Sequence, residues 1–257
     1  MFKLKEERQR IIVNEIKNNG SVMVADLAKK FNVSCMTIRR DLKEIEVVEV
    51  LKRTYGGAIL SIKDKNHSEP PTLDRMDLMR KEKNRIAHAA AELVHEKEMI
   101  FLGSGTTTLY VAQALQERDD ITVVSNALTI LNYLATNGKM NLIGVGGFLR
   151  RKEFSMIGHF ADKVISDLRM DKVIMGMRGV HPRFGLTSDH PQELLTDRTI
   201  MGISDTVIIV ADHTKIGHVA TSRTAPVEKA SLLITSVEAP IEIVNAIISL
   251  GVRVELV

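Results

Sequence analysis

The sequence predicts an α/β protein in two parts: a small N-terminal head of helices with a β-hairpin, and a larger domain around a mostly parallel sheet. In the first 60 residues, apolar side chains recur at helical spacing. Beyond residue 80, short apolar runs alternate with helix-like stretches. Between them, residues 59–75 mix charges with the Pro70-Pro71 pair, which is typical of an exposed linker. We therefore expect a head at residues 1–58, a linker at 59–75 and a body at 76–257.

The composition limits the class of protein. With 44% hydrophobic and 26% charged residues, the 257-residue chain has enough apolar material for packed cores. No apolar run approaches the roughly 18–20 residues that span a bilayer, and the charged start MFKLKEERQR does not resemble a secretory signal. The single cysteine, Cys35, excludes an intramolecular disulfide. We expect a cytoplasmic protein with no membrane partner.

The charge distribution separates the two parts. Residues 1–60 hold 12 Lys and Arg against 8 Asp and Glu, which gives +4, and the remainder holds 23 against 24, which gives −1. A basic head on a near-neutral body indicates a polyanionic partner for the head. A solvated charged surface fits the composition alone equally well.

Three helices are predicted in the head. Residues 4–18 form the first, with Ile12 and Ile16 one turn apart, and Gly20 follows it. The second has an apolar face of Val24, Leu27, Ala28 and Phe31. Ser34 is a favourable N-cap for the third, whose apolar face is Ile38, Leu42 and Ile45.

The third helix carries a polar, basic side opposite its apolar face. Two helices joined by a short turn, the second beginning with such residues, are typical of a helix-turn-helix whose second helix enters the major groove of DNA. Arg suits guanine or phosphate, and Thr suits a thymine methyl or a phosphate. A three-helix domain with a charged surface is the alternative. The candidate DNA-binding residues of this helix are Ser34, Met36, Thr37, Arg39, Arg40 and Lys43, with Thr37, Arg39 and Arg40 expected at the DNA.

Residues 47–58 change to a strand-like period. Val48, Val50 and Leu51 predict a β-hairpin that ends at Gly56-Gly57. A basic hairpin beside a recognition helix is expected to act as a wing on the DNA backbone. Its candidate phosphate contacts are Lys52, Arg53 and Tyr55.

The body is predicted to contain a helix over residues 81–94 and then seven strands. Near-continuous apolar strands separated by helices predict a mostly parallel sheet covered on both faces. The seven runs are residues 99–102, 121–124, 142–145, 173–175, 207–211, 232–234 and 252–256.

Polar and glycine-rich residues follow several of these strands, at the edge where open α/β sheets bind ligands. The sharpest is GSGTTT at residues 103–108, in which two glycines expose backbone N–H groups, three threonines add hydroxyl donors and a helix follows. This pattern predicts a phosphate site. It is neither a P-loop nor a dinucleotide fingerprint. An ordinary strand-to-helix turn with a Thr cap is the alternative.

The runs VSCMTIRRDLKEIE and LKRTYGGA resemble the N-terminal signature of the DeoR family of bacterial sugar-metabolism repressors. FLGSGTTTLYVAQAL, ITVVSNAL, LIGVGGFLR, GLTSDHPQE and VIIVADHTKIG are similar to its sensor domain, so the resemblance covers nearly the whole chain. It implies a winged helix-turn-helix, and a sensor similar in fold to ribose-5-phosphate isomerase. It also implies a phosphorylated sugar or a close relative as effector.

The resemblance also implies roles for individual residues. Ser104, Gly105, Thr106, Thr107 and Thr108, after Gly103, would hold phosphate. Asn126, Gly146, Gly147 and Arg150 would line the pocket. Glu193 and Lys215 would reach the hydroxyls or phosphate of the sugar.

The chain departs from the family pattern at several positions. Glu49 stands where the family has a wing-turn glycine, and Tyr55 where it has histidine. Asp197-Arg198 replaces a Lys-Arg pair, so Arg198 is expected to supply the cation. The string DHP at residues 189–191 also differs from the common form and suggests an unusual effector.

We expect a symmetric homo-oligomer, a dimer or tetramer, that binds double-stranded operator DNA and leaves it when the effector binds. The rival function is a sugar-phosphate isomerase or related hydrolase, with Glu193 as an acid/base carboxylate and Lys215 as a cation in its pocket. The DNA-binding signature of residues 1–58 disfavours an enzyme, and the polar strand ends disfavour a purely structural module. No catalytic residue or cofactor is expected. No metal is expected either, because His213 and His218 alone are weak evidence for a metal. Cys35 is read as a helix-start residue in preference to a redox switch.

Overall fold

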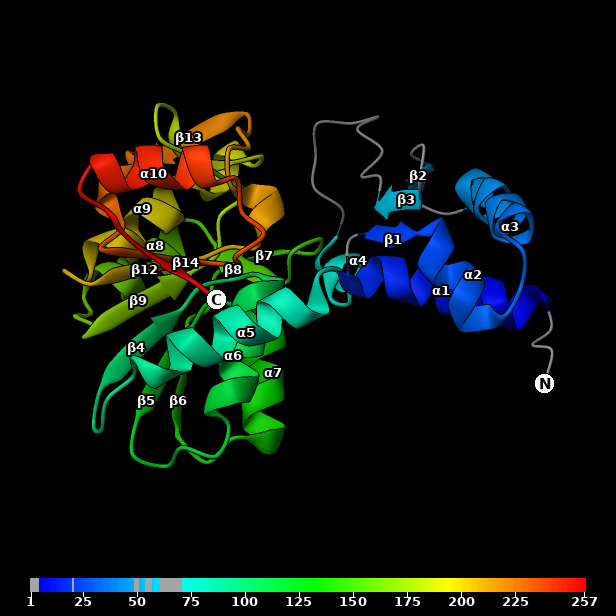
Figure 1. The fold of residues 1–257 in the computed structure, drawn as a ribbon. Coiled ribbons are helices and arrows are strands. Elements are labelled where there is room, and N and C mark those ends of the chain that lie inside the picture. The colour runs from blue at the N-terminus through cyan, green and yellow to red at the C-terminus, as the bar shows by residue number, and fades with distance from the viewer. Residues whose placement is uncertain (1–4, 20, 49–50, 54–56, 61–70) are drawn as a thin grey trace. The chain divides into compact units, whose positions relative to one another are not determined.

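The computed structural model describes residues 5–19, 21–48, 51–53, 57–60 and 71–257 (Figure 1). The chain divides into two compact units. The smaller comprises residues 1–66 with 76–81, and the larger comprises residues 67–75 with 82–257.

The smaller unit contains the three predicted helices, and they are confirmed as α1 (Lys5–Asn19), α2 (Val24–Phe31) and α3 (Cys35–Val48). Their apolar faces meet in one core, in which Ile12, Ile38 and Leu42 are almost completely buried. A three-stranded antiparallel sheet completes the unit, in the order β1 (Ser21–Met23), β3 (Gly57–Leu60) and β2 (Leu51–Arg53).

The predicted hairpin is present, but its bounds were wrong. Val48 belongs to α3, because the buried Ile45 keeps the last turns of the helix packed despite the strand propensity of valine. Glu49 and residues 54–56, between β2 and β3 in the sequence, lie outside the described residues. Gly57 begins a strand instead of ending one.

The third strand, β1, was not predicted. Gly57 packs against it so closely that a Cβ atom there would lie 2.0 Å from the carbonyl oxygen of Val22. A side chain at residue 57 is therefore excluded by the pairing of β3 with β1, which explains the glycine.

A strand and a helix occupy the two ends of the predicted linker, which is therefore shorter than predicted. β3 extends to Leu60, and a short helix, α4 (Thr72–Arg75), belongs to the larger unit. Residues 61–70, within the predicted linker, lie outside the described residues.

The larger unit is built on a seven-stranded sheet in which every pair of neighbouring strands is parallel. All seven apolar runs predicted as strands are its strands, so the predicted fold class is confirmed. They are β4 (Met99–Leu102), β5 (Thr122–Ser125), β6 (Asn141–Gly144), β9 (Lys172–Met175), β12 (Val207–Val210), β14 (Leu232–Thr235) and β15 (Arg253–Leu256).

The strand order is β15-β14-β12-β9-β4-β5-β6. The chain adds strands on one side of β4 and later on the other, so the winding direction reverses between β4 and β9. Right-handed crossovers then place α6 (Thr106–Leu115) and α7 (Leu128–Asn137) on one face, and α9 (Leu194–Gly202) and α10 (Ile241–Ser249) on the other (Figure 1). Ligands of open α/β sheets bind at such a switch point, beyond the carboxyl ends of the strands.

Two antiparallel additions lie between the sheet strands in sequence. One is a hairpin of β7 (Phe148–Arg150) and β8 (Ser155–Ile157), followed by α8 (His159–Ser166). The other is a small sheet of β10 (Gly179–His181), β11 (Gly185–Ser188) and β13 (Ser222–Ala225). α5 (Arg80–Glu92) precedes β4 and covers much of the predicted helix over residues 81–94. The described residues also form three short 3-10 helices, η1 (Pro191–Glu193), η2 (His213–Lys215) and η3 (Val227–Lys229).

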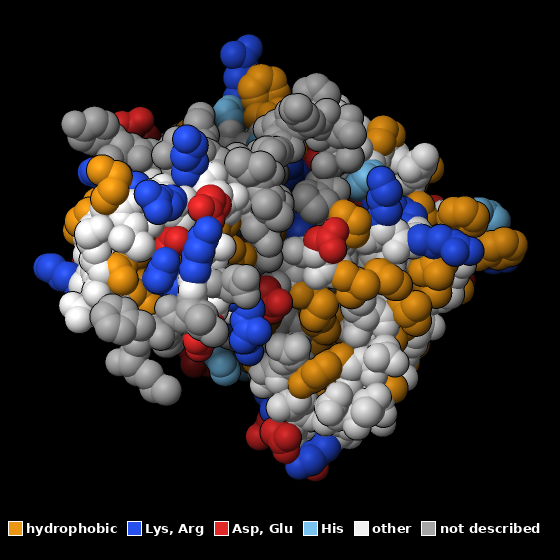
Figure 2. Space-filling model, turned by 90° about the vertical axis from the view of Figure 1, so that its right-hand side faces the viewer, with side chains coloured by type: hydrophobic (Ala, Val, Ile, Leu, Met, Phe, Trp, Pro, Cys, Tyr) orange, Lys and Arg blue, Asp and Glu red, His pale blue; other side chains and the backbone are white. Residues whose placement is uncertain are grey.

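Hydrophobic side chains also reach the surface. Figure 2 shows them gathered over part of the face it draws, with Lys and Arg side chains gathered over another part. Among the large hydrophobic side chains that the structure describes, the most exposed are those of Phe148, Phe160 and Leu195, at 72%, 76% and 68%. None of the helices in the described part of the chain has the length and apolar character needed to cross a membrane.

Candidate DNA-binding helix and effector site

The turn between α2 and α3 is held by the backbone. Asn32 takes a left-handed conformation with φ 52°, and the N–H of Val33 donates to the carbonyl of Ala28 at 3.0 Å. Asparagine tolerates this conformation better than most residues do. The turn fixes the angle at which α3 leaves α2, as a helix-turn-helix requires.

Ser34 caps α3, as the sequence predicts. Its hydroxyl accepts a hydrogen bond from the backbone N–H of Thr37 at 3.1 Å and is 2.9 Å from the Thr37 hydroxyl. The cap satisfies a donor at the helix start. Both hydroxyls thus already take part in hydrogen bonds at the start of the helix, and any contact they make with DNA must be an additional hydrogen bond.

The exposed side of α3 matches the predicted DNA-reading face. Met36 is 67% exposed, and Arg39, Arg40 and Lys43 are exposed as well. The three cations form no ion pair with a described residue. The opposite side of α3 is fixed, because the guanidinium of Arg8 donates to both carboxylate oxygens of the buried Asp41, at 2.6 and 3.1 Å. This pair raises the pKa of Arg8 and holds α3 against α1.

The structure describes the predicted wing residues only in part. Lys52 and Arg53 lie in β2, but their side chains are outside the described residues, and so is Tyr55. Their roles stay predictions.

The predicted phosphate cradle forms the start of α6. Gly105 precedes the helix with φ 141°, a conformation that side chains strongly disfavour, and no side chain caps the helix. The first backbone N–H groups are therefore not capped by a side chain. Thr106, Thr107 and Thr108 are buried, and the Thr108 hydroxyl donates to the carbonyl of Gly105 at 3.0 Å, so the loop itself uses one of the three hydroxyls.

The cradle lies at the switch point of the sheet. The N–H of Gly103 donates to the carbonyl of Ile174 in β9 at 2.9 Å, and a Cβ at residue 103 would lie 2.9 Å from the Met175 Cβ. Gly176, directly after β9, would place a Cβ 3.9 Å from the carbonyl oxygen of Ser104. Sequence reasoning missed Gly176, because strand order alone brings it beside the cradle.

Asn126 connects the cradle to the β7–β8 hairpin. Its side-chain amide nitrogen donates to the backbone carbonyl of Met156 at 2.9 Å, and the backbone carbonyl of Asn126 accepts from the N–H of Met156 at 2.7 Å. The preceding Ser125 donates to the carbonyl of Leu102, the last residue of β4, at 2.7 Å. Asn126 is 2% exposed, and its Oδ1 has no hydrogen-bond partner among the described residues.

Arg150 and Ser155 of this hairpin belong to a cluster of charged and hydroxyl side chains. The guanidinium of Arg150 pairs with the carboxylate of Glu193, and both side chains are about nine-tenths buried. The hydroxyls of Ser155 and Ser188 lie 3.4 Å from the two oxygens of Glu193. Burial raises the pKa of Asp197 to about 7, against the opposing charge of Arg150. The structure therefore brings the predicted Arg150 and Glu193 together and adds Asp197.

The two predicted pocket glycines differ in their surroundings. A Cβ at Gly147 would lie 2.9 Å from the carbonyl oxygen of Ile157 and 3.0 Å from the Cβ of Ala161, so Gly147 permits close packing of the hairpin and α8. A Cβ at Gly146 would meet open space. Close packing thus explains the glycine at position 147 but not the glycine at position 146.

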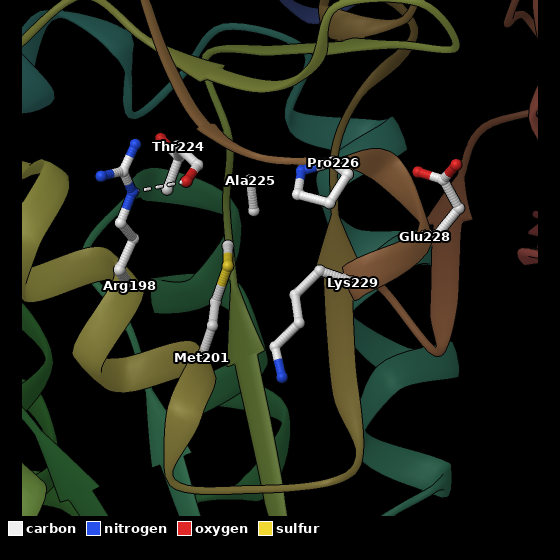
Figure 3. A pocket seen from close by; sticks show the side chains of 7 residues that line it. All are labelled: Arg198, Met201, Thr224, Ala225, Pro226, Glu228 and Lys229. Carbon is white, nitrogen blue, oxygen red and sulfur yellow. Dashed lines mark hydrogen bonds between the residues drawn. The ribbon is translucent and has the colours of Figure 1, made fainter.

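The expectation that Arg198 supplies the cation near Glu193 is wrong. Its guanidinium donates to the carbonyls of Thr224 and Arg223 in β13, at 2.8 and 2.9 Å. Consecutive helical residues point about 100° apart, so Asp197 and Arg198 cannot share a face of α9. Arg198 instead lines an open pocket of about 410 Å³ with Met201, Thr224, Ala225, Pro226, Glu228 and Lys229 (Figure 3).

The loop after β12 carries a second polar cluster. Glu82 of α5 is buried and accepts from the Ser236 hydroxyl at 2.7 Å and lies 2.8 Å from the His213 ring nitrogen. The contact with Glu82 raises the pKa of His213, although burial opposes it. Lys215, a predicted effector contact, ends the same short helix and is half-buried. Glu82 and Ser236 carried no sequence signal because they lie 154 residues apart.

His213 and His218 were weak candidates for a metal. Within the described residues, no group of three or more His, Cys, Asp or Glu side chains is placed to hold a metal ion.

Comparison with known families matches both units. A DeoR-like helix-turn-helix domain matches residues 8–63, and the DeoR C terminal sensor domain matches residues 79–237. The glycerol-3-phosphate regulon repressor of Escherichia coli (strain K12) is 30% identical over 97% of this chain and 98% of its own length. The transcriptional repressor AccR of Agrobacterium fabrum is 30% identical over 91% of each chain.

Solved structures show more distant likeness. The full-length sorbitol operon regulator SorC from Klebsiella pneumoniae covers 90% of this chain and 97% of its own, with 11% identity and a TM-score of 0.43. Ribose 5-phosphate isomerase A from Neisseria gonorrhoeae covers 57% of this chain and 55% of its own, with 19% identity and a TM-score of 0.39. The two curated relatives named above are repressors, which favours a regulator over the enzyme alternative. The match to the sensor domain alone covers more than half of this chain, and the helix-turn-helix match covers its N-terminal part. This chain therefore belongs to the DeoR family of transcriptional regulators.

Proposed function

We propose that this regulator represses a carbohydrate catabolic operon and is released from its operator by a phosphorylated sugar or a related metabolite. Residues 1–58 bind operator DNA in the cytoplasm, and residues 76–257 bind the effector. The observation that carries the proposal is the uncapped start of α6, with the left-handed Gly105, at the switch point of a parallel sheet. The sensor match and the named repressors support it.

Arg40→Ala is expected to weaken operator binding by about 1–3 kcal/mol if Arg40 reads a base. Arg40 is exposed on α3, and its charge is not consumed by an ion pair with a described residue. Titrations of labelled operator and of unrelated DNA measure the effect. A base-reading role lowers the affinity for operator more than that for unrelated DNA, whereas a phosphate contact lowers both equally.

The control is Arg10→Ala, which removes the same charge from the exposed side of α1. Equal losses in the two variants would show that α3 has no special role at the DNA.

Thr106→Ala is expected to weaken binding of the phosphorylated effector by about 1.5–3 kcal/mol, since hydrogen bonds to charged groups contribute that much. Thr106 is the first residue of α6 and is 4% exposed. The measurement is the thermal shift of the full chain with a panel of sugar phosphates, because binding to the native state raises the melting temperature.

Thr136→Ala, on the exposed end of α7, removes an equivalent hydroxyl away from the cradle. The assignment of the cradle fails if Thr106→Ala and Thr136→Ala respond alike to the ligand that shifts the wild type.

We also propose a homo-oligomer, a dimer or tetramer, that presents at least two heads to the half-sites of an operator. Exposed apolar side chains on neighbouring elements support an interface between copies: Phe148 lies on β7, which pairs with β8, and Phe160 and Leu195 lie on the packed helices α8 and α9. The effector favours an arrangement in which the heads no longer match the operator half-sites. By linkage, operator DNA weakens effector binding by the same factor.

The β7–β8 hairpin offers a route for the signal. It carries Arg150 at one end, and its turn holds α4, because the N–H of Thr72 donates to the carbonyl of Lys152 at 3.0 Å. The Thr72 hydroxyl donates to the neighbouring Glu153 at 2.6 Å. Since α4 follows the segment that leads from the head, movement of the hairpin would reach that segment.

A further inference from the structure

We propose that His213 and Glu82 form a pH-sensitive latch, which ties the loop after β12 to α5 while His213 carries a proton and loosens when the proton leaves. Both residues belong to the larger unit. The loop continues to Lys215, an expected effector contact, and α5 follows directly on residues 76–81, which group with the smaller unit. The latch itself does not depend on the proposed function; only its effect on Lys215 does.

Glu82, in the first turn of α5, is the fixed half of the latch and is 5% exposed. Its Oε2 accepts from the Ser236 hydroxyl at 2.7 Å and from the backbone N–H of His213 at 3.3 Å. The Nδ1 of His213 lies 2.8 Å from the same oxygen. A carboxylate oxygen only accepts, so this contact requires a proton on Nδ1. Glu82 thus holds the loops after β12 and β14 against α5.

His213 is the half that titrates, and its side chain is 31% exposed, so solvent protons reach the ring. The hydrogen bond to Glu82 raises the pKa of His213, burial opposes the rise, and the charges of Glu82, Asp212 and Glu238 add to it. These carboxylates favour the imidazolium over the neutral ring. Groups of the same elements that can carry positive charge include Lys83, Arg85, Lys215 and His218.

The latch is expected to tighten as the pH falls. A histidine whose pKa is higher in the folded protein than in the unfolded chain stabilises the fold fully below its ordinary value of 6.5. The contribution is lost as the pH rises from there through the folded pKa. The neutral ring then keeps only an ordinary hydrogen bond to Glu82, and a charge-assisted bond is about twice as strong.

Asp197 titrates in the same pH range. Burial raises the pKa of Asp197 to about 7, and a raised carboxyl pKa also lowers stability as the pH rises. The pH dependence of the wild-type stability therefore contains both contributions. The test must cancel every group except His213 and Glu82.

The test is a double-mutant cycle at about pH 5.5 and about pH 8.5, on either side of the ordinary histidine pKa. His213→Asn keeps a side-chain donor that cannot become charged, and Glu82→Gln keeps an acceptor without the charge. Denaturant unfolding of the larger unit in the full-length proteins gives the factor by which the pair raises the folding constant. This factor is expected to be at least about threefold larger at the lower pH. An equal factor at both pH values overturns the latch.

His88→Asn is the matched control, because His88 lies on the exposed side of α5. It makes the same substitution on the same helix away from Glu82, and its effect on stability is expected to be alike at both pH values. A pH-dependent effect as large as that of His213→Asn would overturn the assignment to His213.

Hydrogen exchange locates the effect in the chain. After correction for the intrinsic effect of pH, the protection of residues 211–218 is expected to fall at the higher pH in the wild type and to change less in His213→Asn. The same change in both proteins would mean that the pair does not hold the loop, which overturns the proposal. This comparison carries the test if Glu82→Gln does not fold. Neither measurement uses DNA or an effector, so a failed latch leaves the proposed function standing.

Discussion

A Glu153→Ala variant is expected to lose about 3–5 kcal/mol of unfolding free energy, the usual effect of removing one partner of a buried ion pair. Glu153 lies between β7 and β8 and pairs with Arg75 of α4, and the two side chains are only 9% and 11% exposed. The Thr72 hydroxyl donates to the same carboxylate. Without the carboxylate, the buried Arg75 loses this ion pair. Denaturant unfolding of the full-length chain measures the loss, provided that the transition of the larger unit is resolved.

Two further variants separate charge from packing. Arg75→Met combined with Glu153→Leu replaces the pair by apolar side chains and is expected to cost much less than Glu153→Ala alone. Glu117→Ala breaks an exposed pair with Lys139 and is expected to leave stability nearly unchanged. If Glu153→Ala matched Glu117→Ala, the contact between α4 and the hairpin would not be a stabilising one, and the proposed signal route would lose its support.

An Ile38→Ala variant is expected to destabilise the smaller unit by about 2–5 kcal/mol, the range for large-to-small substitutions in a core. Ile38 is completely buried at the centre of the core that joins α1, α2 and α3. The cavity would also loosen α3, so operator binding is expected to fall along with stability. Circular dichroism during thermal unfolding, together with operator titration, measures both effects.

Met36→Ala is the matched control on the same helix, because Met36 is 67% exposed. Stability is expected to change by at most about 0.5 kcal/mol, as for most surface substitutions. Reduced operator binding without reduced stability would assign Met36 to the DNA contact. A large stability loss in Met36→Ala, or none in Ile38→Ala, would mean that α3 packs through a different face.

The sequence was informative wherever a single element carries its own pattern. Strands buried on both faces are continuous apolar runs, and for this reason all seven strands of the parallel sheet could be predicted. Ser34 was identifiable as a helix cap because a capping residue bonds to a backbone group only three positions away. The strand-to-helix turn at residues 103–108 was likewise predictable, since its glycines and threonines lie within one short loop, and its role in phosphate binding stays a prediction.

Contacts between distant segments were decided by the tertiary structure alone. The strand β1 is too short to show a pattern, and its pairing with Gly57 became visible only when both were placed. Strand order, which sequence periodicity does not encode, set Gly176 beside the cradle. Arg198 was assigned a role near Glu193 from its position in the sequence, but the 100° rotation per helical residue turned it toward β13 and left Asp197 facing Arg150. The sequence by itself therefore determined the three helices of the head and the seven strands of the parallel sheet, and it predicted which helix reads DNA. Folding decided which polar side chains share a site, because burial and charge act between residues that only the tertiary structure brings together.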